Sequence, residues 1–228
     1  VESEDSPSTF YIQEAPFENI VITLYPIGSY MTIGAHIEGQ KWLFTDEYDF
    51  TSYYYINSFE RPIKLEDAES ILFTGRERIA SGRGYLWSRT IPLLKDYFIL
   101  GSGADTFSIA FPSNDYVGKH NAGYGDEIIT KPHSLYLQMG VQTGLVSLIA
   151  FLVFYLIYFI SSFRLYIESS YDSYTEKIGL GIFIGTIGYM ISGLVNDSTI
   201  TVAPIFWVLI GLGISINLKL EDKNKIHT

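Results

Sequence analysis

The chain has 228 residues, no cysteine and a formal net charge of −10, with 47% hydrophobic and 16% aromatic residues. This composition excludes a disordered chain, a disulfide-stapled scaffold and a basic nucleic-acid-binding protein. Residues 1–143 hold 10 of the 15 basic and 19 of the 25 acidic residues, which leaves 5 basic and 6 acidic residues in the last 85 positions. The sequence therefore predicts a polar region followed by a membrane region.

The polar region begins with short segments rich in β-branched and aromatic residues, which fill residues 18–59 and are separated by glycine, proline and acidic residues. This pattern predicts a small antiparallel sheet within an extracytoplasmic region at residues 1–80. Tyr53, Tyr54 and Tyr55 either stack on sugar rings or pack across neighbouring strands.

Residues 81–143 are expected to form an outer-face catalytic loop. Apolar side chains recur near helical spacing in residues 85–100, which predicts an amphipathic helix at the membrane surface with Pro92 near a bend. Further on, we expect one continuous helix from residue 133 to residue 163, about 46 Å long. Its first turns would then stand in the headgroup layer or line a wet cavity.

Three uncharged apolar runs cover residues 144–163, 178–196 and 198–218. At about 1.5 Å per residue each run spans roughly 30 Å, the thickness of the hydrocarbon core of a bilayer. We therefore expect a mainly α membrane protein, in which three C-terminal transmembrane helices at residues 144–218 follow a mixed α/β extracytoplasmic region. Pro204 would lie inside the third helix, where neighbouring helices satisfy the freed carbonyl.

The distribution of lysine and arginine indicates the orientation. Basic residues flank the apolar runs on one side only: Arg164 and Lys177 lie between the first two runs, and Lys219, Lys223 and Lys225 follow the third. The positive-inside rule then predicts a plasma-membrane protein with residues 1–143 outside and a cytoplasmic tail at residues 219–228. Because no signal-like apolar stretch precedes the outer region, we expect upstream helices in a larger multi-pass protein.

Two kinds of side chain are candidates for chemistry. His133 stands at the start of a membrane helix on the outer side, where its imidazole either accepts a proton from a hydroxyl or anchors the helix at the interface. A guanidinium binds phosphate oxygens in a bidentate way, so an arginine cluster suits a lipid-linked phosphate, although a solvated loop or anionic headgroups explain it equally well. The cluster consists of Arg76, Arg78, Arg83 and Arg89. Spacings typical of metal ligands do not occur.

Three segments in order, SGRGYLW at residues 81–87, LGSGADTF at 100–107 and PHSLYLQMGVQTGLVSLIAFL at 132–152, resemble the O-antigen ligase/polymerase family of membrane glycosyltransferases. The resemblance implies that Arg83 binds a lipid-linked diphosphate and that His133 activates the acceptor hydroxyl. Ser134 and Gln142 depart from the family pattern, in which asparagine and glutamate are usual.

The resemblance implies an enzyme that joins polyprenyl-diphosphate-linked glycan units on the outer membrane face, by direct displacement and without a metal or other cofactor. Its catalytic residues would be His133 and Arg83, and its expected substrate-binding residues are Arg76, Arg78, Arg89, Tyr136 and Gln138. The expected partners are the lipid-linked glycan donor, a glycan acceptor, the bilayer and other polysaccharide export proteins of the cell envelope, and no nucleic acid. We favour a polymerase over a ligase that uses another acceptor. Two alternatives stay open. The protein binds or transports lipid-linked saccharides without catalysis, or the sheet serves only as a sensor domain at the cell surface.

Overall fold

The computed structural model describes residues 2–3, 6–27, 30–37, 39–46 and 52–227. The chain divides into two compact units. One consists of Val1–Ala68 and Pro112–Glu127, and the other of Glu69–Phe111 and Ile128–Thr228. The sheet and the three long C-terminal helices therefore belong to different units.

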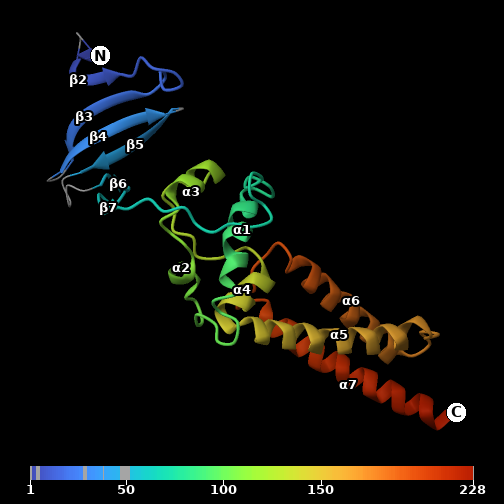
Figure 1. Cartoon of the computed structure of the whole chain (residues 1–228). Helices are drawn as coiled ribbons and strands as arrows, with labels where there is room; N and C mark the ends of the chain where they lie inside the picture. Colours follow the sequence, from blue (N-terminus) through green and yellow to red (C-terminus); the bar gives the residue numbers. More distant parts are fainter. Residues whose placement is uncertain (1, 4–5, 28–29, 38, 47–51, 228) are drawn as a thin grey trace. The chain divides into compact units, whose positions relative to one another are not determined.

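The first unit is built on an antiparallel sheet of seven strands, in which strands consecutive in the chain are neighbours (Figure 1). The longest pairing joins β3 to β4, from Val21 opposite His36 to Ile27 opposite Tyr30. The predicted antiparallel sheet is confirmed and extends beyond residues 18–59 on both sides, whereas residues 47–51 lie outside the described residues. The strands are β1 Glu2–Ser3, β2 Ser6–Tyr11, β3 Val21–Ile27, β4 Tyr30–Ile37, β5 Gln40–Thr45, β6 Tyr54–Ile56 and β7 Pro62–Ile63.

The tyrosines next to β6 have different environments. Tyr55 is 4% exposed and its ring packs against Phe44 on the neighbouring strand, with the ring centroids 6.2 Å apart. Its hydroxyl donates a hydrogen bond to Oδ1 of Asp126 at 2.9 Å. Tyr53, in contrast, is 63% exposed. Tyr55 is therefore a packing residue of the sheet unit, as the cross-strand alternative predicts.

Helix α3, Tyr116–Ala122, belongs to the same unit as the sheet. The ring of Tyr116 lies 4.9 Å from that of Tyr55, and the ring of His120 lies 4.4 Å from that of Trp42. These contacts explain why residues 112–127, which the sequence assigns to the catalytic loop, pack with the sheet.

The second unit is helical, and its three long helices α5, α6 and α7 pack together as a bundle (Figure 1). Its buried apolar core comes from all three helices and includes Phe151, Phe183 and Phe206. The helices are α1 Arg83–Leu93, α2 Phe107–Ala110, α4 Leu135–Thr143, α5 Leu145–Ile167, α6 Tyr174–Ser192 and α7 Ala203–His227.

The expected continuous helix over residues 133–163 is wrong, because the chain breaks between α4 and α5 at Gly144. The φ of Gly144 is 99°, and a Cβ at this position would lie 2.5 Å from the carbonyl oxygen of Ile99. Glycine is therefore required both by the backbone conformation and by the close passage of the loop that contains Ile99.

That loop, residues 97–103, supplies hydrogen-bond partners to both helix ends at the break. Helix ends leave backbone groups without intrahelical partners, so the loop makes the interruption stable. Leu145 and Val146 of α5 donate to the carbonyls of Tyr97 and Phe98, and the carbonyls of Val141 and Gln142 in α4 accept from the N–H groups of Ser102 and Gly103. The glycine-rich turn at residues 101–103 thus has a structural role.

Helix α1 is shorter than the predicted helix at residues 85–100 and ends close to Pro92. Its buried side chains include Tyr85 and Leu86, which are adjacent and so point in different directions, and also Ser88 and Thr90. The helix packs against α4. It is thus enclosed within the unit on more than one side.

Within the part of the chain that the structure describes, two helices, α5 and the part of α7 over Ala203–Lys223, are long and apolar enough to cross a membrane. The expectation of three such helices is not confirmed. Helix α6 begins at Tyr174, so its first turn carries Glu176 and Lys177, and it ends at Ser192, before the end of the apolar run. Pro204 lies in the first turn of α7 and not inside it, a position where its missing N–H costs no helical hydrogen bond.

Candidate functional site

His133 lies just before α4 and pairs with a carboxylate from a distant part of the sequence. Its Nδ1 is 2.9 Å from Oδ2 of Asp197, a residue in the connection between α6 and α7. The side chain of Asp197 is 8% exposed and that of His133 is 45% exposed. An imidazole that donates from Nδ1 to a carboxylate keeps Nε2 as a proton acceptor. The pair therefore combines a buried carboxylate with a partly exposed imidazole.

The backbone at His133 is in an unusual conformation. Its φ is 51°, in the left-handed region that non-glycine residues seldom adopt. The next turn is held in place because the N–H of Leu135 donates to the carbonyls of both Gly193 and Asn196, at 2.9 and 2.8 Å. A Cβ on Gly193 would lie 2.8 Å from the side chain of Leu135. The start of α4 is thus docked closely on the end of α6, which brings His133 to Asp197.

Two further side chains of α4 secure this docking. The amide oxygen of Gln138 accepts a hydrogen bond from the backbone N–H of Ser198 at 3.0 Å, directly next to Asp197. The hydroxyl of Tyr136 donates to the carbonyl of Met190 in α6 at 2.6 Å. Gln138 therefore fixes the turn that carries the carboxylate, and Tyr136 fixes the helix before it.

Arg83 is the first residue of α1 and follows a tightly folded turn. Ala80, Ser81 and Gly82 all have positive φ, and a Cβ on Gly84 would lie 2.6 Å from the carbonyl oxygen of Arg76. The first N–H groups of α1 donate to carbonyls of this turn. An anion near the helix start would therefore be bound by the Arg83 side chain and not by these N–H groups. Nη1 of Arg83 donates to the carbonyl of Ala80 at 3.2 Å, while its Nε is buried without a hydrogen-bond partner among the described residues.

A single side chain connects the arginine helix to the histidine segment. Trp87 lies one turn after Arg83 on the same face of α1, and its Nε1 donates to the carbonyl of Pro132 at 3.0 Å. Pro132 directly precedes His133. The α1 face that carries Arg83 therefore lies against the chain beside the base. Among the described residues no hydrogen bond or ion pair joins Arg83 to His133 or Asp197 directly.

Residues 20–152 match the model of the O-antigen ligase family, a span that includes Arg83, Trp87 and His133. The chain belongs to the O-antigen ligase family. Comparisons with curated proteins and with solved structures give no significant match. The family assignment and the two apolar helices α5 and α7 together make the chain part of a membrane protein of polysaccharide biosynthesis.

The structure separates the four arginines that the sequence groups together. In this O-antigen ligase family chain, Arg89 has two partners within the helical unit. Its Nη1 lies 3.2 Å from Oε1 of Glu77, and its guanidinium stacks over the ring of Tyr85, 4.6 Å from the ring centroid. Its side chain is only 10% exposed. Arg76 and Arg78 are exposed and lie in the loop before α1. Arg89 therefore holds the loop that precedes α1, whereas Arg83 lies at the start of this helix.

Asp197 is the functional candidate that sequence reasoning missed. In the sequence it is the one charged residue between the second and third apolar runs. An isolated carboxylate in such a position is itself a signal of function, because an ionised group near hydrocarbon is costly unless it has a partner. Within the described ranges, no group of three or more histidine, cysteine, aspartate or glutamate side chains is arranged to hold a metal ion.

Proposed function

We propose that this chain carries the acid–base site of an enzyme that transfers a glycan from a polyprenyl diphosphate to a hydroxyl of another glycan. The observation that supports the proposal is the 2.9 Å contact between His133 and the buried Asp197, which leaves the imidazole accessible. Family membership and the apolar helices support the membrane setting.

In the proposed reaction, Nε2 of His133 accepts the proton of the acceptor hydroxyl while the hydroxyl oxygen attacks the anomeric carbon of the donor. Asp197 holds the ring through Nδ1 and stabilises the imidazolium that forms. A new glycosidic C–O bond forms as the C–O bond to the diphosphate breaks. Attack opposite the leaving group inverts the anomeric centre.

The bonding electron pair leaves with the polyprenyl diphosphate, and a cation is needed to stabilise it. Arg83 is proposed for this role, because its guanidinium can bind two phosphate oxygens at once and it lies one turn from Trp87, which contacts the histidine segment. Arg76 and Arg78 are exposed in the preceding loop and are proposed to attract the diphosphate before it binds. Tyr136, Gln138 and Arg89 are proposed as positioning residues, since their polar groups have partners within the chain.

The proposed orientation follows the basic residues. The connection that contains Asp197 and the segment that contains His133 would face the outside of the plasma membrane, and the loop between α5 and α6 would face the cytoplasm. A lipid-linked donor would then reach the site from the outer leaflet. We favour a polymerase of exopolysaccharide or capsule over a ligase, with a glycan as acceptor and with other cell-envelope export proteins as partners.

The proposal is tested with the whole protein that carries the substitution His133→Gln, by measuring donor binding and glycan elongation. Binding of the lipid-linked donor should be retained, whereas elongation of glycan chains on a gel should stop. His36→Gln is a matched control, because His36 lies on β4 in the sheet unit. Chain lengths that stay normal with His133→Gln would contradict catalysis by this residue and favour the non-catalytic lipid-saccharide carrier.

A further inference from the structure

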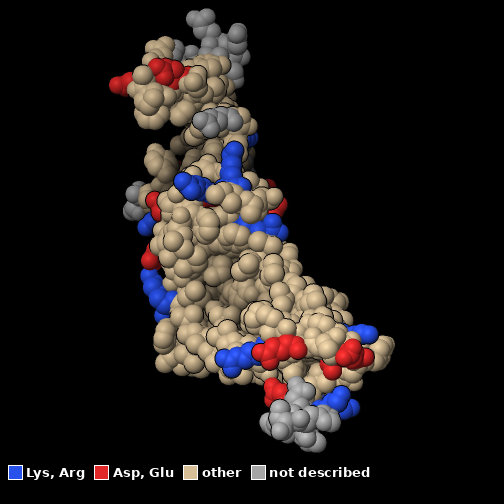
Figure 2. Space-filling model, turned by 90° about the vertical axis from the view of Figure 1, so that its right-hand side faces the viewer, with Lys and Arg blue, Asp and Glu red and all other residues tan. Residues whose placement is uncertain are grey.

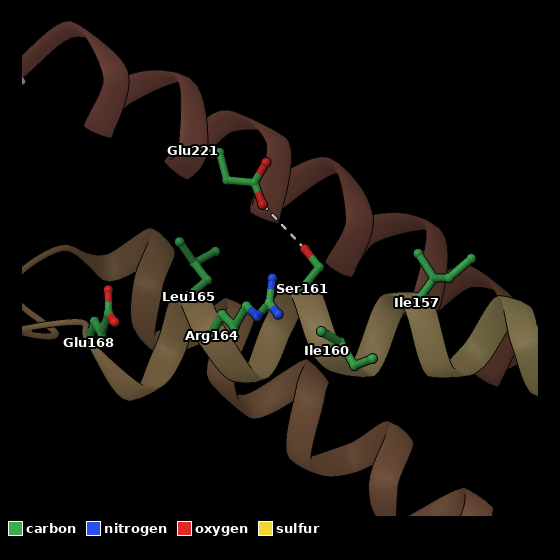
Figure 3. Close-up of a pocket in the computed structure, with 7 residues that line it drawn as sticks. All are labelled: Ile157, Ile160, Ser161, Arg164, Leu165, Glu168 and Glu221. Carbon is green, nitrogen blue, oxygen red and sulfur yellow. Dashed lines mark hydrogen bonds between the residues drawn. The ribbon is translucent and has the colours of Figure 1, made fainter.

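A groove runs between α5 and α7 at the end of the bundle far from His133 (Figure 3). It has a volume of about 460 Å³. Six lining residues come from α5 and its end, and one comes from α7. They are Ile157, Ile160, Ser161, Arg164, Leu165 and Glu168, with Glu221 on α7.

One half of this groove is apolar. Ile157 and Ile160 are 65% and 41% exposed, and a second cavity of about 220 Å³ shares Ile157 and extends along α5 to Phe154. Together the groove and this second cavity follow α5 from Phe154 to Glu168 for roughly 21 Å, which exceeds half of the hydrocarbon thickness of about 30 Å. The groove therefore has the depth of one leaflet of a bilayer.

The other half of the groove carries charges of both signs. Figure 3 shows that Arg164 and Glu221 come from facing helices and lie beside Ser161, whose hydroxyl donates to the Glu221 carboxylate at 3.3 Å. Glu168 lies one turn beyond Arg164 and is exposed. Among the described residues Arg164 has no hydrogen bond or ion pair, so its guanidinium is available to a ligand. On the face drawn in Figure 2, acidic and basic side chains gather at the C-terminal end of the bundle.

We propose that this groove binds a zwitterionic phospholipid of the phosphoethanolamine class. The Arg164 guanidinium binds the phosphate through two oxygens, and the carboxylates of Glu168 and Glu221 accept hydrogen bonds from the ammonium group. One acyl chain lies along Ile157 and Ile160.

The pattern of charge selects this headgroup over two others. A choline headgroup has no N–H to donate to the carboxylates, and an anionic headgroup without an ammonium group would face two carboxylates with a single guanidinium. The site is independent of the proposed reaction, because it lies near the end of α5, a helix of about 34 Å whose beginning is next to α4 and His133.

The test measures lipid retention by native mass spectrometry on the whole protein, purified and given equal amounts of phosphatidylethanolamine, phosphatidylcholine and phosphatidylglycerol. We expect the unmodified protein to retain phosphatidylethanolamine roughly tenfold better than phosphatidylcholine. Glu168→Gln combined with Glu221→Gln should abolish this preference while phospholipid is still bound. Arg164→Ala should release all three lipids. Lys177→Ala removes a cation of the same end of the bundle outside the groove and should change nothing.

Equal retention of phosphatidylethanolamine and phosphatidylcholine by the unmodified protein would overturn the proposal. Retention that persists in Arg164→Ala would overturn it as well. If no lipid is retained and a cysteine introduced at Ile160 crosslinks to another part of the protein, a further protein segment fills the groove and the lipid site does not exist.

Discussion

Replacement of Asp197 by asparagine is the sharpest test of the histidine–carboxylate pair. The change keeps the shape of a side chain that is 8% exposed but removes its charge, 2.9 Å from Nδ1 of His133. A hydrogen bond to a charged group contributes about 1.5–3 kcal/mol. If that contribution is made in the transition state, kcat falls by about 10- to 150-fold, since 1.4 kcal/mol corresponds to a factor of ten.

A larger loss is expected if the asparagine turns its amide N–H₂ toward the imidazole. Nδ1 then becomes the acceptor and Nε2 carries the proton, which is the wrong tautomer for a base. In a Ser-His-Asp triad this change costs about 10⁴-fold in kcat. For Asp197→Asn we therefore expect a loss of at least tenfold in kcat and little change in the KM for the donor.

The assay uses the whole protein with a polyprenyl-diphosphate-linked glycan and follows glycan chain length over time. Asp172→Asn is the control, because Asp172 is an exposed carboxylate in the loop between α5 and α6. The thermal unfolding temperature of both variants should match the unmodified protein. An unchanged kcat for Asp197→Asn, or an effect on the KM of the donor alone, would refute the role of the carboxylate in orienting the base.

Three other substitutions test the surroundings of the site. Arg83→Ala should lower kcat by about 10²–10³-fold, as expected for loss of one charge-stabilising group, with Arg83→Lys intermediate; equal activity of all three would contradict the proposed diphosphate contact. Gly101→Ala should lower the free energy of unfolding by about 1–3 kcal/mol, because a Cβ there would overlap the backbone at the end of α4. Gly181→Ala is its control, because a Cβ at that position meets nothing within 4 Å. Burial raises the pKa of Glu77, but the N–H groups of Glu77 and Gly75 and the Arg89 guanidinium lower it more, so the net pKa is below its usual value. A depressed pKa stabilises the fold above the unfolded value and loses this effect as pH falls through the folded one, so Glu77→Gln should be destabilising at pH 7 and approach the unmodified protein in unfolding experiments below about pH 4.

Local sequence patterns predicted a substantial part of this molecule. Strand propensity and punctuation predicted the antiparallel sheet at residues 18–59, and unbroken hydropathy predicted α5 and α7. Three short motifs predicted the family that the comparison with family models shows. These features depend on residues that are neighbours in the chain, so they can be read without knowing the fold.

The tertiary structure alone decided the features that join distant segments. The break at Gly144 could not be predicted from residues 133–163, because its cause is a loop that begins at Tyr97, far earlier in the chain, and provides partners for both helix ends. Likewise, the apolar run at residues 178–196 predicted a third membrane span, although the first turn of α6 holds a glutamate and a lysine.

The candidate site has the same character. His133 and Arg83 are candidates from the sequence, but Asp197 is a candidate only because the fold places its Oδ2 2.9 Å from Nδ1 of His133. A sequence specifies which groups are available, whereas the pairing of a carboxylate with one imidazole depends on how helices pack. The sequence by itself therefore determined a membrane chain with a histidine and an arginine as candidates, and the packing of α4 on α6 decided which carboxylate lies against that histidine.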